Sequence, residues 1–414
     1  VEQRAGRIVA LPSKIHDVVA AARVLDHAPT LAAALVIQAR IDFAVSDNAD
    51  AESTLRELAQ VAARARDDRA AAFAWIELIG TIGSDQGKFS EARALVPMAA
   101  AAVLRAGDPP ELRADLLYSQ AGLERTPDPQ AALELLTRVR ALLERSGAAS
   151  PGSPLARRLV LTLSEVAAVR ADLGDHDGAI ASYRDAIARW RALYGDDSPD
   201  EAFTLLDLAS SLDAAGKHDD SIAAYRHALA IREARLGDSM TTAYTREFLA
   251  MALHTQGRWE EAMGAHDGAI RSYRARVPGS AQLARVLGNR AETLVQLGRF
   301  AEAAQGYDEA LALLERDDHE TFSRAMTLYN RGELQRRRAR CPDALRDFAR
   351  AADLAASLHD QGSTILIHAL VGEAGCLLAA RRHGEAIARL GRALELKASP
   401  DAAFQVALAR AYLG

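Results

Sequence analysis

The stretch LGDHDGAIASYRDAIA, from Leu173 to Ala188, decides the fold because it recurs along the chain. Its glycine, first small residue, tyrosine and later alanine all return 42 residues on, in AAGKHDDSIAAYRHALA at residues 214–230. The paired positions are Gly174 and Gly216, Ala179 and Ser221, Tyr183 and Tyr225, and Ala186 and Ala228. Further copies follow at steps of 41 to 42 residues, and weaker ones in phase with them lie upstream from residue 51. A fixed period of this length is typical of repeat proteins.

Each repeat has the pattern of two helices joined by a tight turn. The small and aromatic positions, such as 179, 183 and 186, are spaced i, i+4 and i+7, which places them on one face of a helix. The preceding segment, such as FTLLDLASSLDAAG at residues 203–216, also has a helical pattern and ends at a glycine. Because one hairpin is too small to bury both of its faces, the hairpins must stack. The sequence therefore predicts an all-α fold, a right-handed superhelical solenoid of antiparallel helix hairpins.

The phase of the repeats predicts how the chain is divided. The segment SGAASPGSP (146–154) lengthens one step to 47 residues and indicates a loop between two repeats. The expected segments are an N-terminal helix and linker at residues 1–29, degenerate repeats at 30–145, the loop at 146–156, regular repeats at 157–397, and the first helix of a truncated terminal repeat at 398–414.

Charge and composition exclude several classes of protein. The formal net charge is −6, so no sequence-wide electrostatic attraction to nucleic acid exists. No apolar run is long enough to insert into a membrane. The two cysteines and eleven histidines show no metal-binding spacing, so we expect no metal, no cofactor and no catalytic residue. The expected location is the cytoplasm, or the periplasm if a membrane span precedes Val1.

The repeat resembles the tetratricopeptide repeat. The features that carry this resemblance are Ala-x3-Tyr-x2-Ala, as at residues 179–186, and a small residue twelve positions earlier, Ala167. The period of 41 to 42 residues exceeds the 34 of a plain tetratricopeptide unit. Residues 225–262 resemble the longer, kinesin-light-chain-like version. The resemblance implies a protein-binding or peptide-binding scaffold without catalysis.

A second resemblance concerns three segments, at residues 67–95, 111–122 and 402–414. Their order is similar to the region that follows the catalytic domain in large bacterial serine/threonine protein kinases. This implies the regulatory or sensing arm of such a kinase, with a kinase domain upstream in the same chain. The sequence itself has no Gly-rich phosphate loop, His-Arg-Asp loop or Asp-Phe-Gly motif, so we expect no enzyme activity here. The alternatives are a free-standing scaffold, or the effector-binding helical domain of a transcription regulator or nucleotide-switch protein.

The resemblance also suggests which residues bind a partner. In tetratricopeptide arrays the position two before the small residue of the first helix projects into the concave groove. In this chain that position is occupied by Glu165, Asp207, Phe248, Asn289 and Asn330. Arg285 and Arg337 are expected to face the same groove, because they lie four before Asn289 and seven after Asn330. Asparagine amides both donate and accept hydrogen bonds, so we expect a protein or peptide ligand held partly by its backbone.

Overall fold

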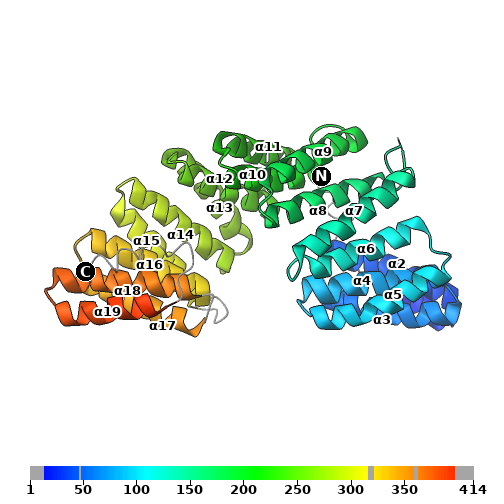
Figure 1. The fold of residues 1–414 in the computed structure, drawn as a ribbon, viewed down its shortest axis with the longest axis horizontal. Helices are drawn as coiled ribbons and strands as arrows, with labels where there is room; N and C mark the ends of the chain where they lie inside the picture. Colours follow the sequence, from blue (N-terminus) through cyan, green and yellow to red (C-terminus); the bar gives the residue numbers. More distant parts are fainter. Residues whose placement is uncertain (1–13, 46–47, 151, 316–320, 359–361, 397–414) are drawn as a thin grey trace. The chain divides into compact units, whose positions relative to one another are not determined.

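The computed structural model describes residues 14–45, 48–150, 152–315, 321–358 and 362–396 (Figure 1). This part of the chain is helical and contains no strand, which confirms the predicted all-α class. None of its helices has the length and apolar character needed to cross a membrane. The predicted terminal helix at 398–414 lies outside the described residues.

The helices follow one another with short connections. The first spans residues 14–24. The others are α2 (Ala28–Val45), α3 (Asn48–Ala65), α4 (Asp68–Gly80), the π-helical turn η1 (Thr81–Asp85), α5 (Phe89–Arg105), α6 (Pro110–Glu124), α7 (Pro129–Arg145), α8 (Ala156–Asp172), α9 (His176–Tyr194), α10 (Pro199–Ala214), α11 (His218–Leu236), α12 (Met240–Thr255), α13 (Trp259–Arg276), α14 (Ala281–Gln296), α15 (Phe300–Leu314), α16 (Thr321–Arg337), α17 (Cys341–Ser357), α18 (Ser363–Ala379) and α19 (His383–Glu395).

Consecutive helices pack as hairpins, as the repeat pattern predicts. For example, α8 packs against α9, α12 against α13 and α14 against α15. The turn between the two helices contains a residue in the left-handed conformation, such as Gly174 (φ +80°) and Gly298 (φ +73°). Where the repeat has lost its glycine, Ala339 adopts the same conformation with φ +57°. The turn geometry is therefore retained even without the residue that favours it most.

The recurring small and aromatic positions form the core. Ala179, Ala228 and Ala303 are fully buried, and Tyr183 and Tyr307 are almost completely buried. Small side chains at these positions let the two helices approach closely, while the aromatic ring fills the space towards the neighbouring hairpin. The repeat signature is thus a packing signature.

The chain divides into two compact units, residues 1–231 and 232–414, with the division inside α11. The first unit contains α2 to α10, and its large N-terminal core is formed by α2 to α6 with the helix at 14–24. The second unit contains α12 to α19, with separate clusters of buried side chains along it. Each unit is a stack of antiparallel helix hairpins.

Candidate functional site

The residues predicted to line a groove all lie on the first helices of their hairpins, and they are divided between the two units. In the first unit they are Glu165 on α8 and Asp207 on α10; in the second they are Phe248 on α12, Arg285 and Asn289 on α14, and Asn330 and Arg337 on α16. The predicted residues therefore form two groups, one in each unit.

In the first unit, a pocket of about 380 Å³ lies between α8 and α10 and contains both Glu165 and Asp207. Phe203, one helical turn before Asp207, also lines this pocket and is 62% exposed. Trp190 of α9 is buried, and its indole N–H donates a hydrogen bond of 3.0 Å to the Thr204 hydroxyl. The pocket thus offers an exposed aromatic surface beside carboxylates.

Carboxylates outnumber cations among the residues that line this pocket. They are Glu165, Asp172, Asp200 and Asp207, against the single guanidinium of Arg125. Arg125 donates to Asp172 at 2.7 Å and to Glu165 at 3.4 Å. Burial raises the pKa of Glu165, and the charge of Arg125 opposes that rise. Arg157, which is not among the lining residues, pairs with Asp200 at 3.3 Å, so four carboxylates face two guanidinium groups. The remaining negative charge favours a ligand that carries a cationic group.

In the second unit, Arg285 is engaged with an internal carboxylate. It forms an ion pair with Glu247 of α12, whose side chain is fully buried. The Tyr273 hydroxyl also donates to Glu247, at 3.4 Å. Burial raises the pKa of Glu247 to about 7, although the charge of Arg285 opposes the rise. Arg285 therefore neutralises a buried acid as well as reaching the surface, where its side chain is 40% exposed.

The remaining predicted residues of the second unit are more open. Phe248 is half-buried and packs edge-to-face on Tyr244, with 4.5 Å between the ring centroids. Asn289 and Asn330 are half-buried, and neither side-chain amide bonds to the described residues. Arg337 is exposed and forms no ion pair within the described part of the chain. These amides and this guanidinium are available to a ligand.

Sequence reasoning missed two members of the first pocket and one buried acid. Phe203 carried a usable signal, because it lies four residues before Asp207 and so on the same face of α10. Arg125 follows the end of α6, outside the repeat positions, and Glu247 lies one position before Phe248. Nothing in the period marks these two residues.

One group of side chains has the spacing of a metal site. Ligand atoms of Asp197, Glu201 and His227 lie within 4.8 Å of one another. Glu201 is buried, however, and Arg191 already pairs with it at 2.7 Å. His227 lies 3.0 Å from the Asp197 carboxylate. A cation would compete with Arg191 for Glu201, so these contacts are accounted for as an ion-pair network.

A family model of the tetratricopeptide repeat matches residues 158–234 and 239–316. These are tetratricopeptide repeats. The match extends over the hairpins from α8 to α15 and confirms the predicted resemblance there. Repeats of this kind are typically non-catalytic. No curated protein sequence matches the chain.

Solved structures share the fold of these tetratricopeptide repeats. The apo form of the quorum sensor NprR from B. thuringiensis is similar with a TM-score of 0.60 and 12% identity, over 87% of this chain and 97% of that one. BtubC (BKLC) from P. vanneervenii is similar with a TM-score of 0.50 and 22% identity, over 56% of this chain and 93% of that one. The repeats of a Podosopora anserina putative kinesin light chain have a TM-score of 0.44 and 14% identity, over 49% of this chain and 97% of that one. This likeness is too weak to carry an argument. At these identities the similarity concerns the fold.

Proposed function

We propose that this chain is a non-catalytic scaffold that binds a protein or peptide through the first helices of its hairpins. The observation that carries this proposal is the pocket between α8 and α10, where four carboxylates and one guanidinium surround the exposed Phe203. An exposed aromatic ring beside several carboxylates is typical of a recognition site rather than of a packed core.

The chemistry of this pocket specifies its ligand. A basic side chain would pair with Asp207 and its neighbouring carboxylates, while an adjacent apolar side chain would cover Phe203. The ligand is therefore a peptide segment with a Lys or Arg next to an apolar residue. Arg125 reduces the negative charge at one side of the pocket, because it already donates hydrogen bonds to Asp172 and Glu165.

In the second unit, Asn289 and Asn330 would hold the backbone of an extended segment. Their unbonded amides have the donor and acceptor groups that this requires. Phe248 and the exposed Arg337 would add an apolar and a cationic contact, and Glu247 would keep Arg285 in position. An asparagine contact of this kind is independent of the ligand's side chains, so specificity would come from the other residues.

The setting that we propose is the regulatory or sensing arm of a bacterial serine/threonine kinase, with the kinase domain in the same protein. Its support is the resemblance of residues 67–95, 111–122 and 402–414. An effector-binding domain of a transcription regulator is the second candidate, supported by the similarity in fold to the quorum sensor NprR. The gene sequence upstream of the Val1 codon separates these settings. Kinase motifs there would favour the kinase arm, and a Walker loop would indicate a nucleotide-switch protein. A start codon close to the Val1 codon would indicate a free-standing scaffold.

The test of peptide binding uses the full chain and a library of peptides that pair a basic with an apolar residue. Fluorescence anisotropy should detect binding, and Asp207→Asn combined with Phe203→Ser should weaken it about tenfold or more. The matched control is Asp220→Asn with Val24→Ser, two exposed sites of the same unit outside the pocket. Equal binding by both double variants, or no binding by the wild type, would contradict this site.

A separate measurement tests the second unit. In a pull-down from lysate of the host, Asn289→Ala with Asn330→Ala should lose partners that the wild type retains. Because both amides lack bonds to the described residues, the melting temperature should remain nearly unchanged. A parallel loss of partner binding and of thermal stability would show that these asparagines serve the fold.

A further inference from the structure

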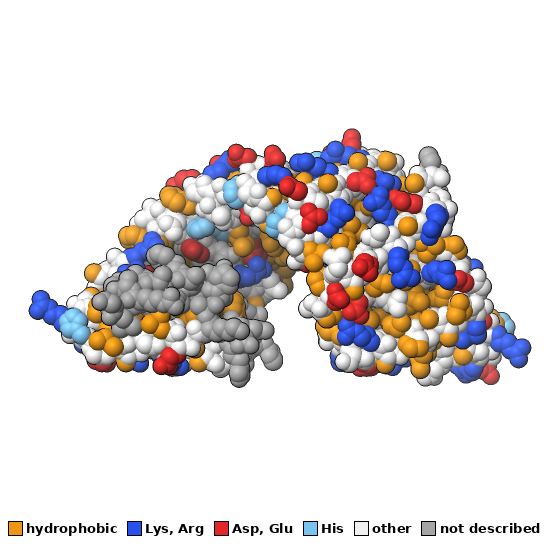
Figure 2. Space-filling view, viewed as in Figure 1, with side chains coloured by type: hydrophobic (Ala, Val, Ile, Leu, Met, Phe, Trp, Pro, Cys, Tyr) orange, Lys and Arg blue, Asp and Glu red, His pale blue; other side chains and the backbone are white. Residues whose placement is uncertain are grey.

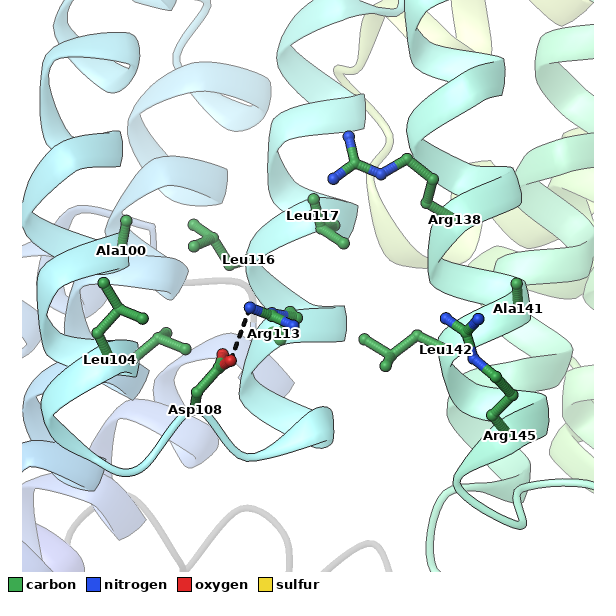
Figure 3. A pocket seen from close by; sticks show the side chains of 11 residues that line it. Ala100, Leu104, Asp108, Arg113, Leu116, Leu117, Arg138, Ala141, Leu142 and Arg145 are labelled. Atoms are coloured by element: carbon green, nitrogen blue, oxygen red, sulfur yellow. Dashed lines mark ion pairs between the residues drawn. The ribbon is translucent and has the colours of Figure 1, made fainter.

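The first unit has an open trough on a different set of elements from the pocket just described. It lies between α5 and α7 and is floored by α6, with a volume of about 570 Å³ (Figure 3). Figure 3 shows Ala100 and Leu104 of α5 on one side, Leu117 of α6 behind, and Leu142 of α7 on the other. Since α5 and α7 are the second helices of the α4–α5 and α6–α7 hairpins, the trough separates the second helices of two neighbouring hairpins.

The trough continues along α7. A neighbouring pocket of about 500 Å³ shares Leu117 and Arg138 with it and adds Leu135. The joined lining runs along α7 from Leu135 to Arg145, which corresponds to about 15 Å at 1.5 Å per residue. This length matches about three turns of a helix laid alongside α7.

The floor and the two sides of the trough carry apolar side chains that are partly exposed. Leu104 is 64% exposed, and Leu117 and Leu142 are half-buried. On the face of the first unit seen in Figure 2, hydrophobic side chains gather over α5 and α6, with Lys and Arg side chains among them. A continuous apolar surface rimmed by charge is typical of an interaction site.

The charges at the rim differ in how they are compensated. Arg113 pairs with Asp108 at 2.6 Å, and Arg93 pairs with Glu124 at 3.2 Å. Arg138 and Arg145 form no ion pair within the described part of the chain, and both are exposed. They lie seven residues apart on α7, or about 10 Å along its axis. Two uncompensated cations are therefore placed two helical turns apart beside an apolar floor.

We propose that this trough binds an amphipathic helix of a partner protein, with two acidic side chains spaced two turns apart. These acids pair with Arg138 and Arg145, and the apolar side chains between them cover Leu104, Leu117 and Leu142. Charge complementarity selects the acidic partner, and the length of the joined lining selects a helix over a compact small molecule. The chemistry is opposite to that of the acidic pocket between α8 and α10, so the two sites stand or fall separately.

The probe is a labelled synthetic helical peptide of about 15 residues with Glu at positions i and i+7 and Leu at i+3 and i+4. A second peptide carries Lys in place of both Glu residues, and a third has a central proline that breaks the helix. In anisotropy titrations, the wild-type chain should bind the Glu peptide about tenfold more tightly than the Lys peptide. The proline peptide should bind weakly.

Charge reversal is the decisive arm. Arg138→Glu with Arg145→Glu should invert the preference, so that the Lys peptide binds more tightly than the Glu peptide. The control, Arg64→Glu with Arg140→Glu, changes the net charge equally at exposed positions outside the trough and should retain the wild-type preference. Leu104→Ser should weaken both peptides, because it removes apolar surface from the α5 side of the trough.

Three outcomes would overturn the proposal. The Arg138→Glu, Arg145→Glu variant could still prefer the Glu peptide, or the wild type could bind the helical and the proline peptides equally. The wild type could also bind none of the peptides and yet bind dodecanoate saturably. The last would assign the trough to a small anionic amphiphile. Asp207→Asn with Phe203→Ser should bind the Glu peptide like the wild type, which separates this result from that of the acidic pocket.

Discussion

In the first unit, Glu165 lines an open pocket and contacts Arg125 at 3.4 Å, whereas in the second unit Glu247 is fully buried against Arg285. Both acids lie on the first helix of a hairpin, and both meet an arginine from a neighbouring hairpin. The side chain of Glu165 is still 38% exposed, but that of Glu247 is not exposed at all. The same pairing of residue types thus leaves a surface for a ligand in one unit and forms part of the core in the other.

A large effect is expected from removing the arginine of the closed pair. Arg285→Ala leaves Glu247 buried without its partner, and because the carboxyl can then take up a proton, the loss of stability should be limited to about 2 kcal/mol at pH 8. The matched change, Arg125→Ala, leaves Glu165 in contact with water and should cost no more than about 1 kcal/mol. Urea unfolding followed by circular dichroism measures both. Similar losses in the two variants would remove the distinction between an open and a closed acid.

The pH dependence of stability sharpens the same comparison. Glu247 has a pKa of about 7 in the folded chain against a usual value of 4.5, so the folded state holds a proton that the unfolded state releases between these values. The contribution of Glu247 to the free energy of unfolding is therefore greatest below about pH 4.5. It falls by about 3 kcal/mol as the pH rises from 4.5 through 7. Glu247→Gln stays neutral throughout and provides the reference.

The quantity to compare is the difference in unfolding free energy between the wild type and Glu247→Gln. As the pH rises from 4.5 to 7, the wild type should lose stability relative to Glu247→Gln. The contributions of the other titrating groups are the same in both proteins and cancel in the difference. A constant difference across this range would mean that Glu247 has the same pKa in the folded chain as in the unfolded chain.

The hairpins could be predicted because each repeat carries its own local signals. Gly174 and its equivalents mark the turn, and Ala179, Tyr183 and Ala186 mark the buried face, so the pattern repeats without reference to distant residues. Glu165 and Asp207 come together for the same reason: stacking places equivalent positions of neighbouring first helices side by side.

The rest of the site depends on contacts that have no period. The partner of Arg285 is Glu247, 38 residues earlier, and this separation differs from the repeat length. Arg138 and Arg145 lie among the degenerate repeats and do not occupy the recurring positions. Which cation has a counter-ion is decided by side-chain packing between helices, and a single sequence contains no signal for that.

A further effect is expected at a close contact in the second unit. The ring of Phe348 on α17 lies between Gly332 and Gly372, and a Cβ added at either glycine would come within 2.7 Å of it. Gly372→Ala should therefore destabilise by about 1–3 kcal/mol through overpacking. Gly375→Ala, three residues along the same helix, meets no atom within 4 Å and should stabilise by about 0.5–1 kcal/mol. Opposite signs in urea midpoints are the expected result, and destabilisation by both would implicate the helix backbone.

The smallest effect concerns how the second helices begin. In the first unit, Asp175 accepts a hydrogen bond of 3.0 Å from the backbone N–H of Gly178, which satisfies one free donor of α9. In the second unit, the equivalent residue before α15 is Arg299, which makes no capping hydrogen bond and pairs instead with Glu302 at 2.7 Å. The same arginine and acid pairing recurs at Arg258 before α13.

Asp175→Ala should destabilise the first unit by about 1 kcal/mol and speed hydrogen exchange of the first amides of α9, because one backbone donor loses its partner. Arg299→Ala should have a smaller effect, since it removes only a solvent-exposed ion pair and leaves the backbone donors of α15 as they were. If Arg299→Ala lowered protection in α15 as much as Asp175→Ala does in α9, the arginine and acid pair would be acting as a cap, and the two units would begin their helices by equivalent means.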